Sequence, residues 1–177
     1  MSNAPDVPSV RTEKALLIVF ADLTRFMVNS RGTPDGPLAE RLDGYYRHVE
    51  KLVATLGGRV VKFMGDAFLA VWPEERAGAG VAALPELKRD IDAWWSAQGW
   101  DSRVVVKAHF GRAVVGPFGE EARFDVIGNE VNVTATLPAR SVSLSAEAFR
   151  CLENGERRAF KKHTPPVIYI PVDDPRP

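Results

Sequence analysis

Residues 59–72 read RVVKFMGDAFLAVW, two short apolar runs separated by a glycine and an aspartate. β-Branched and aromatic residues favour strands, and a Gly-Asp pair between two such runs is typical of a tight turn. The sequence therefore predicts strands over Arg59–Met64 and Ala67–Trp72, joined as a β-hairpin through Gly65 and Asp66. This hairpin sets the fold class, because helical segments are predicted on both sides of it.

Before the hairpin, residues 14–21 form a continuous apolar run, KALLIVFA, which predicts a strand buried on both faces and ending at Asp22. Glycines and prolines at positions 32–37 indicate a loop. From Leu38 the apolar residues follow helical spacing, and the glycine pair at 57–58 ends the predicted helix.

After the hairpin, Pro73–Gln98 is mainly helical in pattern, and Pro85 is expected to begin a second helical piece rather than lie inside one. The later segments predict strands over Arg103–Val115, Arg123–Ile127, Val142–Leu144 and Val167–Ile170, with short helices over Val131–Leu137 and from Ala146. Helices on one face of such a sheet give an α+β fold with a ferredoxin-like βαββαβ core and a mostly antiparallel sheet. Residues 1–12 lack periodicity and are expected to be a disordered arm, leaving 13–177 as a single domain.

Composition narrows the function. The 177 residues carry 23 Lys+Arg and 23 Asp+Glu, a formal net charge of zero, so binding to nucleic acid through its phosphates is not expected. The apolar runs fall far short of the roughly 20 residues of a membrane span, so no membrane insertion is expected. One cysteine, Cys151, excludes an internal disulfide framework, and no secretory pattern is present. These features predict a cytoplasmic protein.

Acidic residues lie at two predicted strand ends that can be neighbours. If the first strand lies beside the hairpin, Asp22 and Asp66 reach one point, and paired carboxylates suit Mg²⁺ or Mn²⁺. Taken alone, the pattern more often means that Asp22 is a helix N-cap and Asp66 a turn residue, since Gly-Asp turns are common. Lys62 within an apolar strand needs a partner, or else marks a solvated edge strand.

Three segments and the order in which they occur are informative together: FAD at 20–22, KFMGD at 62–66 and DVIGNEVN at 125–132. Together with HFGRAVVG at 109–116, they resemble the catalytic domain of class III nucleotidyl cyclases over roughly residues 14–172. The resemblance implies conversion of ATP to 3′,5′-cyclic AMP and pyrophosphate by a two-metal mechanism. It also implies a head-to-tail homodimer with two equivalent sites.

The resemblance also assigns roles to particular residues. It implies that Asp22, Asp66 and the backbone carbonyl of Leu23 bind two Mg²⁺ or Mn²⁺ ions. Backbone N–H groups of residues 23–27, Phe26 among them, would hold the terminal phosphates. The remaining matched positions are those for adenine (Lys62 and Asp125), the ribose (Asn132) and a late phosphate contact (Lys161). Lysine and aspartate at the base-reading positions favour ATP over GTP.

The sequence departs from the family pattern at one position that is important for catalysis. The family usually has an arginine four residues after the asparagine, where this chain has Thr136. Such an arginine can contribute about 10³-fold to phosphoryl transfer. Arg140 could substitute for it, although Pro138 intervenes, and Arg25 and Met27 replace the usual glycine and threonine of the phosphate loop. Two hypotheses follow: an adenylate cyclase of low activity, or an inactive cyclase-homology domain that binds nucleotide or dimerises.

Overall fold

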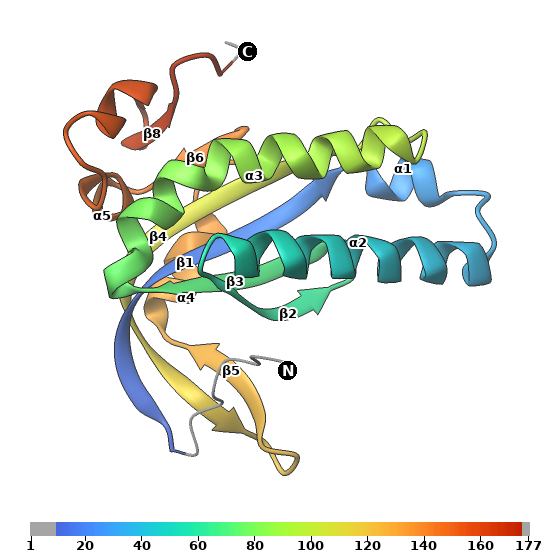
Figure 1. Ribbon diagram of the computed structural model, residues 1–177, viewed down its shortest axis with the longest axis horizontal. Coiled ribbons are helices and arrows are strands. Elements are labelled where there is room, and N and C mark those ends of the chain that lie inside the picture. The colour runs from blue at the N-terminus through green and yellow to red at the C-terminus, as the bar shows by residue number, and fades with distance from the viewer. Residues whose placement is uncertain (1–9, 175–177) are drawn as a thin grey trace.

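Two long antiparallel strands form the middle of the protein in the computed structural model, which describes residues 10–174 (Figure 1). They are β1 (Thr12–Thr24) and β4 (Arg103–Phe118), and they pair along the whole of β1. The buried residues of β1 between positions 15 and 21 are those of the predicted strand, but β1 continues past Asp22. Asp22 therefore lies on a strand rather than after one.

The other strands extend this pair into an eight-stranded sheet. Its order is β2-β3-β1-β4-β6-β8-β7, with β5 paired to the outer part of β4. These strands are β2 (Arg59–Met64), β3 (Ala67–Pro73), β5 (Arg123–Ile127), β6 (Val142–Leu144), β7 (Phe160–His163) and β8 (Ile168–Pro171). Every pairing is antiparallel except β4 with β6. The predicted hairpin and the mostly antiparallel α+β sheet are confirmed, whereas β7 was not predicted.

Two long helices, α2 (Asp35–Thr55) and α3 (Ala77–Ala97), cover one face of the sheet (Figure 1). Their apolar sides pack on alternate strand residues and form the main core. Its largest fully buried side chains include Leu17, Tyr45, Phe68, Trp72, Leu84, Leu87, Ile91 and Trp95. Burying this apolar area is the main source of stability for the fold.

The expected break at Pro85 is wrong. Proline lies inside α3, which runs without interruption. A proline removes one backbone hydrogen bond from a helix. Here Val81, Leu84, Leu87 and Ile91 are all buried along the same side of α3, and this packing keeps the helix continuous. The loop expected over 32–37 is also too long, because α2 begins at Asp35 and its second and third residues are glycine and proline, which the first turn tolerates.

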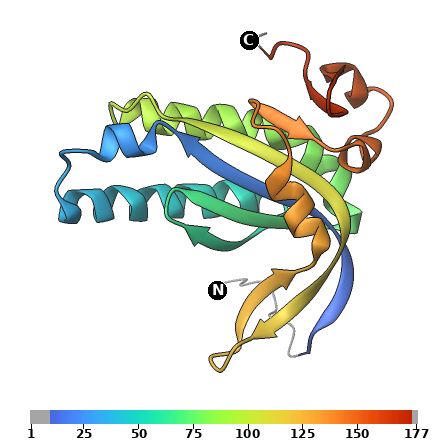
Figure 2. The ribbon, with the colours of Figure 1, turned by 180° about the vertical axis from the view of Figure 1, so that it is seen from behind.

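The opposite face of the sheet carries α4 (Asn129–Thr136), seen from behind in Figure 2. The expectation that all helices lie on one face of the sheet is therefore wrong. A second apolar cluster lies on this side and contains Leu16, Ile18, Leu69, Val71, Ala113, Val115 and Val126, with Val131 of α4 packed against it. Within residues 10–174, most of this face has no helix over it.

Short elements complete the described part of the chain. They are α1 (Phe26–Ser30), α5 (Ala146–Arg150) and the 3₁₀ turns Glu74–Arg76 and Glu156–Ala159. Of the expected N-terminal arm, residues 1–9 lie outside the described residues, and Thr12 already belongs to β1. None of the described helices has the length and hydropathy needed to cross a membrane.

Candidate functional site

Two carboxylates meet at one end of the sheet, as the sequence predicts. Asp66 occupies the β2–β3 turn, and its carboxyl interacts with that of Asp22 on the neighbouring strand β1. Burial raises the pKa of Asp66 above its usual 3.8, and the Asp22 carboxylate adds to this rise. Backbone N–H groups of Asp66 and Leu23 act in the opposite direction. Within residues 10–174, no basic side chain forms an ion pair with either carboxylate, so this acidic edge has unbalanced negative charge.

The chemistry of this acidic edge fits a hard divalent cation. Carboxylate oxygens are the protein ligands that Mg²⁺ prefers, usually one or two of them with water and phosphate oxygens. In the described part of the chain, no group of three or more His, Cys, Asp or Glu side chains could hold a metal ion. Leu23 directs its side chain into the main core, so only its backbone could contribute. A cation here would complete its coordination with that carbonyl, water or a ligand's phosphates.

Two tyrosines of α2 hold the turn that carries Asp66. The Tyr46 hydroxyl donates to the Gly65 carbonyl oxygen over 2.7 Å, and its ring stacks on Phe63 with 4.0 Å between centroids. The Tyr45 hydroxyl lies 3.5 Å from the backbone oxygen of Asp66, and burial raises the pKa of Tyr45 strongly. Sequence reasoning missed both tyrosines as supports of the turn, since their spacing indicated only a buried helix face.

A lysine and an aspartate pair across β2 and β5. The Lys62 Nζ atom lies 2.7 Å from Asp125 Oδ2, and Asp125 also accepts the Val126 N–H over 2.8 Å. Beside them the Arg59 guanidinium lies 3.7 Å from the Phe124 ring centroid, a second cationic contact between the same two strands. The charged Lys62 within an apolar strand thus has a partner inside its own chain.

Asp22, Lys62 and Asn132 lie on the same side of the sheet. Asp22 follows Leu16 and Ile18 at two-residue intervals along β1, which places it on the face of the second apolar cluster. Lys62 pairs in register with Leu69, another member of that cluster. The exposed Asn132 belongs to α4 on the same side, where it lines a depression with Gly128 and Ile127.

Comparison with known proteins agrees with this arrangement. Over 147 residues the chain is 30% identical to adenylate cyclase type 10 of Mus musculus, a match covering 73% of this chain and 9% of the mouse protein. The chain belongs to the class III nucleotidyl cyclases. No protein-family model matches this cyclase domain. It spans about a tenth of the length of the mouse relative.

Solved structures share the fold of this cyclase domain. The adenylyl cyclase CyaB from P. aeruginosa superposes with a TM-score of 0.76 at 21% identity, covering 94% of this chain and 98% of that one. The guanylyl cyclase Cya2 gives 0.72 at 20% identity, covering 89% and 91%. Because both an adenylyl and a guanylyl cyclase match at similar scores, the fold alone does not distinguish ATP from GTP.

Residues 23–27, which we call the phosphate-loop segment because phosphate binding is expected there, are anchored by the side chains of Arg25 and Phe26. Arg25 has a left-handed backbone, with φ of 60°, and its guanidinium pairs with Asp101 at 3.0 Å, which directs it to the loop before β4. The Phe26 ring packs against Trp95 and Trp100, with centroids 6.3 and 5.8 Å away. The first hydrogen bonds of α1 come from residues 28 and 29 to the Arg25 carbonyl. For Phe26, only the backbone amide remains to contact a phosphate.

The end of α4 has no arginine on it. Thr136 is the last residue of this helix, and its hydroxyl donates to the Val133 carbonyl oxygen over 2.9 Å. Arg140 follows after the helix has ended, and its guanidinium lies 3.1 Å from His163 Nε2 in β7. Arg140 therefore does not extend the face of α4 that carries Asn132.

Lys161 lies apart from the other candidate residues. It belongs to β7, at the opposite edge of the sheet from β2. Its Nζ atom donates to the backbone oxygens of Val172 and Asp174 over 2.8 and 3.2 Å. Within this chain the structure brings Asp22 to Asp66 and Lys62 to Asp125, but does not bring Lys161 to either pair.

Proposed function

We propose that this domain is an adenylate cyclase that converts ATP to 3′,5′-cyclic AMP and pyrophosphate. The observation that carries the proposal is the Lys62–Asp125 pair, with 2.7 Å between Nζ and Oδ2. Adenine presents an acceptor at N1 beside a donor at N6, so an ammonium and a carboxylate side by side complement that edge. Guanine presents a carbonyl and an N–H in the opposite order. The curated adenylate cyclase relatives support the same choice.

In the proposed reaction the ribose 3′-oxygen attacks the α-phosphorus. The new P–O bond closes the ring, the bond to the β-phosphate oxygen breaks, and the hydroxyl proton leaves to solvent. Asp22, Asp66 and the Leu23 carbonyl would hold two Mg²⁺ or Mn²⁺ ions. Bound there, such ions lower the pKa of the 3′-hydroxyl and neutralise charge on the triphosphate. The unbalanced charge and raised Asp66 pKa at the acidic edge support this role.

Other residues of the chain would position ATP. Asn132 would orient the ribose, since its exposed amide can both donate and accept. The Phe26 amide and its neighbours at positions 23–27 would bind terminal phosphates. Lys161 would serve a phosphate after exchanging its contacts with the Val172 and Asp174 carbonyls.

The proposed active form is a head-to-tail homodimer. One protomer would supply the metal ligands, and its partner would supply Lys62, Asp125 and Asn132. Exposed apolar side chains support a partner on the side of the sheet that carries the second cluster: Met64 of β2 and Val133 of α4 are 41% and 40% exposed. Two equivalent sites are expected from a two-fold interface. The single free cysteine agrees with a reducing compartment, and we place the reaction in the cytoplasm.

Product analysis tests the function. Purified protein is incubated with ATP or GTP and Mg²⁺ or Mn²⁺, beside the Asp22→Ala variant, and the products are separated by chromatography. We expect cyclic AMP from ATP with wild type only. Absence of any cyclic product from a folded dimer that still binds ATP would instead identify a nucleotide-binding module, the alternative that Thr136 favours.

Mixing two inactive variants tests the dimer. Asp22→Ala removes a metal ligand, and Lys62→Ala removes a base-reading group. If the two halves of a site come from different protomers, an equal mixture regains about a quarter of wild-type activity, because half of the dimers are mixed and each has one intact site. No recovery after subunit exchange would refute the head-to-tail arrangement.

A further inference from the structure

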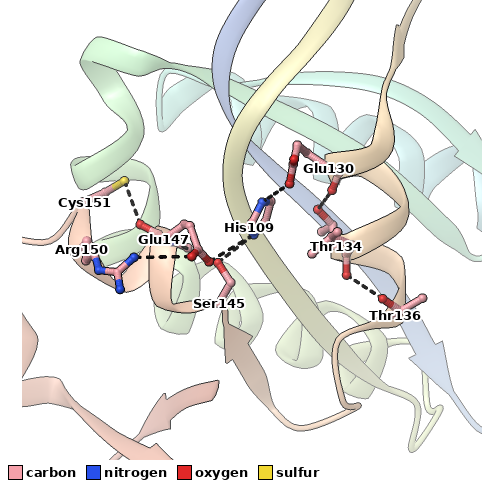
Figure 3. Close-up of polar contacts among 10 residues, drawn as sticks. His109, Glu130, Thr134, Thr136, Ser145, Glu147, Arg150 and Cys151 are labelled. Atoms are coloured by element: carbon pink, nitrogen blue, oxygen red, sulfur yellow. Dashed lines mark hydrogen bonds and ion pairs between the residues drawn. The ribbon is translucent and has the colours of Figure 1, made fainter. Parts of the chain in front are cut away.

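A buried histidine connects three elements on the α4 side of the sheet (Figure 3). His109, on β4, is 5% exposed and forms polar contacts through both ring nitrogens. Its Nε2 lies 2.6 Å from Glu130 Oε2 in the first turn of α4, and its Nδ1 lies 2.9 Å from Ser145 Oγ, just before α5. A second carboxylate oxygen, Glu147 Oε2 on α5, is 3.7 Å from Nδ1.

The two ring nitrogens of His109 meet different kinds of partner. An ionised Glu130 carboxylate only accepts, so Nε2 donates to it, and the charged acceptor strengthens this bond. The Ser145 oxygen accepts the Ala148 N–H over 3.1 Å, and its hydroxyl can either donate to Nδ1 or accept from it. The pKa of Glu147 is lowered by its own backbone N–H and by the Ser145 hydroxyl.

The fold leaves space for the His109–Glu130 contact. Gly111 lies two residues beyond His109 on the same face of β4. A Cβ atom at position 111 would come within 2.7 Å of Glu130 Cγ and 3.0 Å of His109 Nε2. The φ of Gly111 lies outside the left-handed region that favours glycine, so the absence of a side chain here serves the contact and not the backbone.

The last turn of α4 is also fastened to β4. Lys107 lies two residues before His109 on the same face, and its Nζ donates to the Ala135 carbonyl oxygen over 2.8 Å. A cation at a helix C-terminus is favourable because unpaired carbonyls end there. Since α4 is only eight residues long, contacts at its first and last turns fix both its position and its rotation on the sheet. Asn132 lies between these two contacts.

We propose that His109 is a positioning residue that, through Glu130, holds α4 and thereby Asn132 in the geometry needed for turnover. This inference rests on the proposed function. His109 does not touch the reacting atoms in this proposal, and its effect passes through Glu130 and the helix. A displacement of about 1 Å at a reacting group can lower the rate about a hundredfold, so the contact is expected to act on kcat more than on KM.

Alanine variants of the two carboxylates near His109 form a matched test. Glu130→Ala removes the contact to α4, whereas Glu147→Ala removes a carboxylate beside the same imidazole from α5, which has no proposed site residue. We expect kcat of Glu130→Ala to fall about tenfold to a hundredfold with KM for ATP within threefold, and kcat of Glu147→Ala to stay within twofold. Glu130→Gln, which keeps an acceptor, should recover most of the loss. Equal losses in both alanine variants, or none in Glu130→Ala, would overturn the proposal.

Two further measurements separate this proposal from the function itself. Gly111→Ala pushes Glu130 aside without changing any charge, so it should lower kcat as Glu130→Ala does. Amide hydrogen exchange over residues 129–136 reports on α4 without any nucleotide. We expect about tenfold faster exchange in Glu130→Ala and Gly111→Ala, and no change in Glu147→Ala. Unchanged exchange in the first two refutes the anchor, while faster exchange in a protein without cyclase activity refutes only the proposed function.

Discussion

The two halves of the candidate site differ in how their charge is balanced. At the acidic edge, Asp22 and Asp66 interact with each other, and within residues 10–174 neither pairs with a basic side chain. In the other half, Lys62 and Asp125 neutralise each other at 2.7 Å. An unbalanced pair of carboxylates favours a cation, whereas a self-neutralised pair suits a ligand group with no net charge, such as a base. This contrast supports the proposal that metal and base bind in different halves.

The difference also affects stability. The pKa of Asp66 is raised in the fold, so its contribution to stability is present below its usual 3.8 and is lost as the pH rises through the raised value. At neutral pH without metal, the acidic edge therefore destabilises the domain. A bound cation would reverse this effect and favour the ionised form.

Removing one carboxylate should have the largest effect. Asp66→Asn keeps the size of the side chain but halves the charge of the acidic edge, so we expect turnover with Mg²⁺ or Mn²⁺ to fall at least about a hundredfold. The measurement is cyclic AMP formation at saturating ATP. Full activity in this variant would disprove the metal assignment.

Denaturant unfolding of the same Asp66→Asn variant provides the control at pH 7. Without metal, the variant should be more stable than wild type, because no partly buried charge remains at position 66 and the repulsion with Asp22 is gone. With Mn²⁺ at a hundred times its Kd, wild type should gain about 2.7 kcal/mol and the variant much less. Equal gains in both would show that the cation binds elsewhere.

Exchanging the base-reading pair should have the next largest effect. In Lys62→Glu with Asp125→Cys, the donor and acceptor pattern no longer complements adenine, and we expect the ATP-to-GTP ratio of kcat/KM to fall about tenfold to a hundredfold. Turnover of each nucleotide under competition measures this ratio. The acidic edge is unaffected, so Mn²⁺ stabilisation serves as the control. An unchanged ratio would remove the base-reading role from both residues.

Adding a cation to the Lys62–Asp125 half tests whether the lack of an arginine on α4 limits the rate. Thr136→Arg puts a guanidinium one helical turn after Asn132, where it can stabilise charge on the phosphates, and we expect kcat to rise about tenfold. Thr136→Lys is the matched control, with the same charge but no planar fork. If neither variant is faster than wild type, the lack of an arginine on α4 does not limit the rate.

The smallest effect is expected at the phosphate-loop segment. Arg25→Gly removes the exposed ion pair to Asp101, which water screens almost completely, and relieves a left-handed backbone at the same position. These changes oppose each other, so we expect stability close to that of wild type and activity within about threefold. Thermal unfolding and cyclic AMP assays check this. A large loss of activity would mean that the Arg25 side chain, and not the amides alone, binds phosphate.

Much of the candidate site could be predicted because its residues lie on or beside short strands and a turn that local patterns define. The hairpin with its Gly-Asp turn and the apolar strand before Asp22 place both carboxylates, since the predicted strands prove to be neighbours. The spacing of the three motifs indicated the family that the comparisons confirm. The roles of all the candidate site residues stay predictions, those of Asn132 and Lys161 included, and so does the dimer.

Other features could not be predicted, because they depend on contacts between residues distant in the sequence. Pro85 indicates a helix start by its local chemistry, but packing of α3 on the sheet overrides it. Arg25 gives no local signal that it pairs with Asp101, and the same is true of Glu130 and His109, which are 21 residues apart.

The sequence by itself determined most of the strand and helix pattern, the family, and the residues that we propose hold a cation and read a base. It did so because periodicity and turn chemistry act over a few neighbouring residues. Only the tertiary structure decided that Lys62 meets Asp125, that Arg140 turns to His163, and that His109 holds α4 through Glu130. Those choices depend on side-chain directions across paired strands and packed helices, which exist only once the sheet has formed.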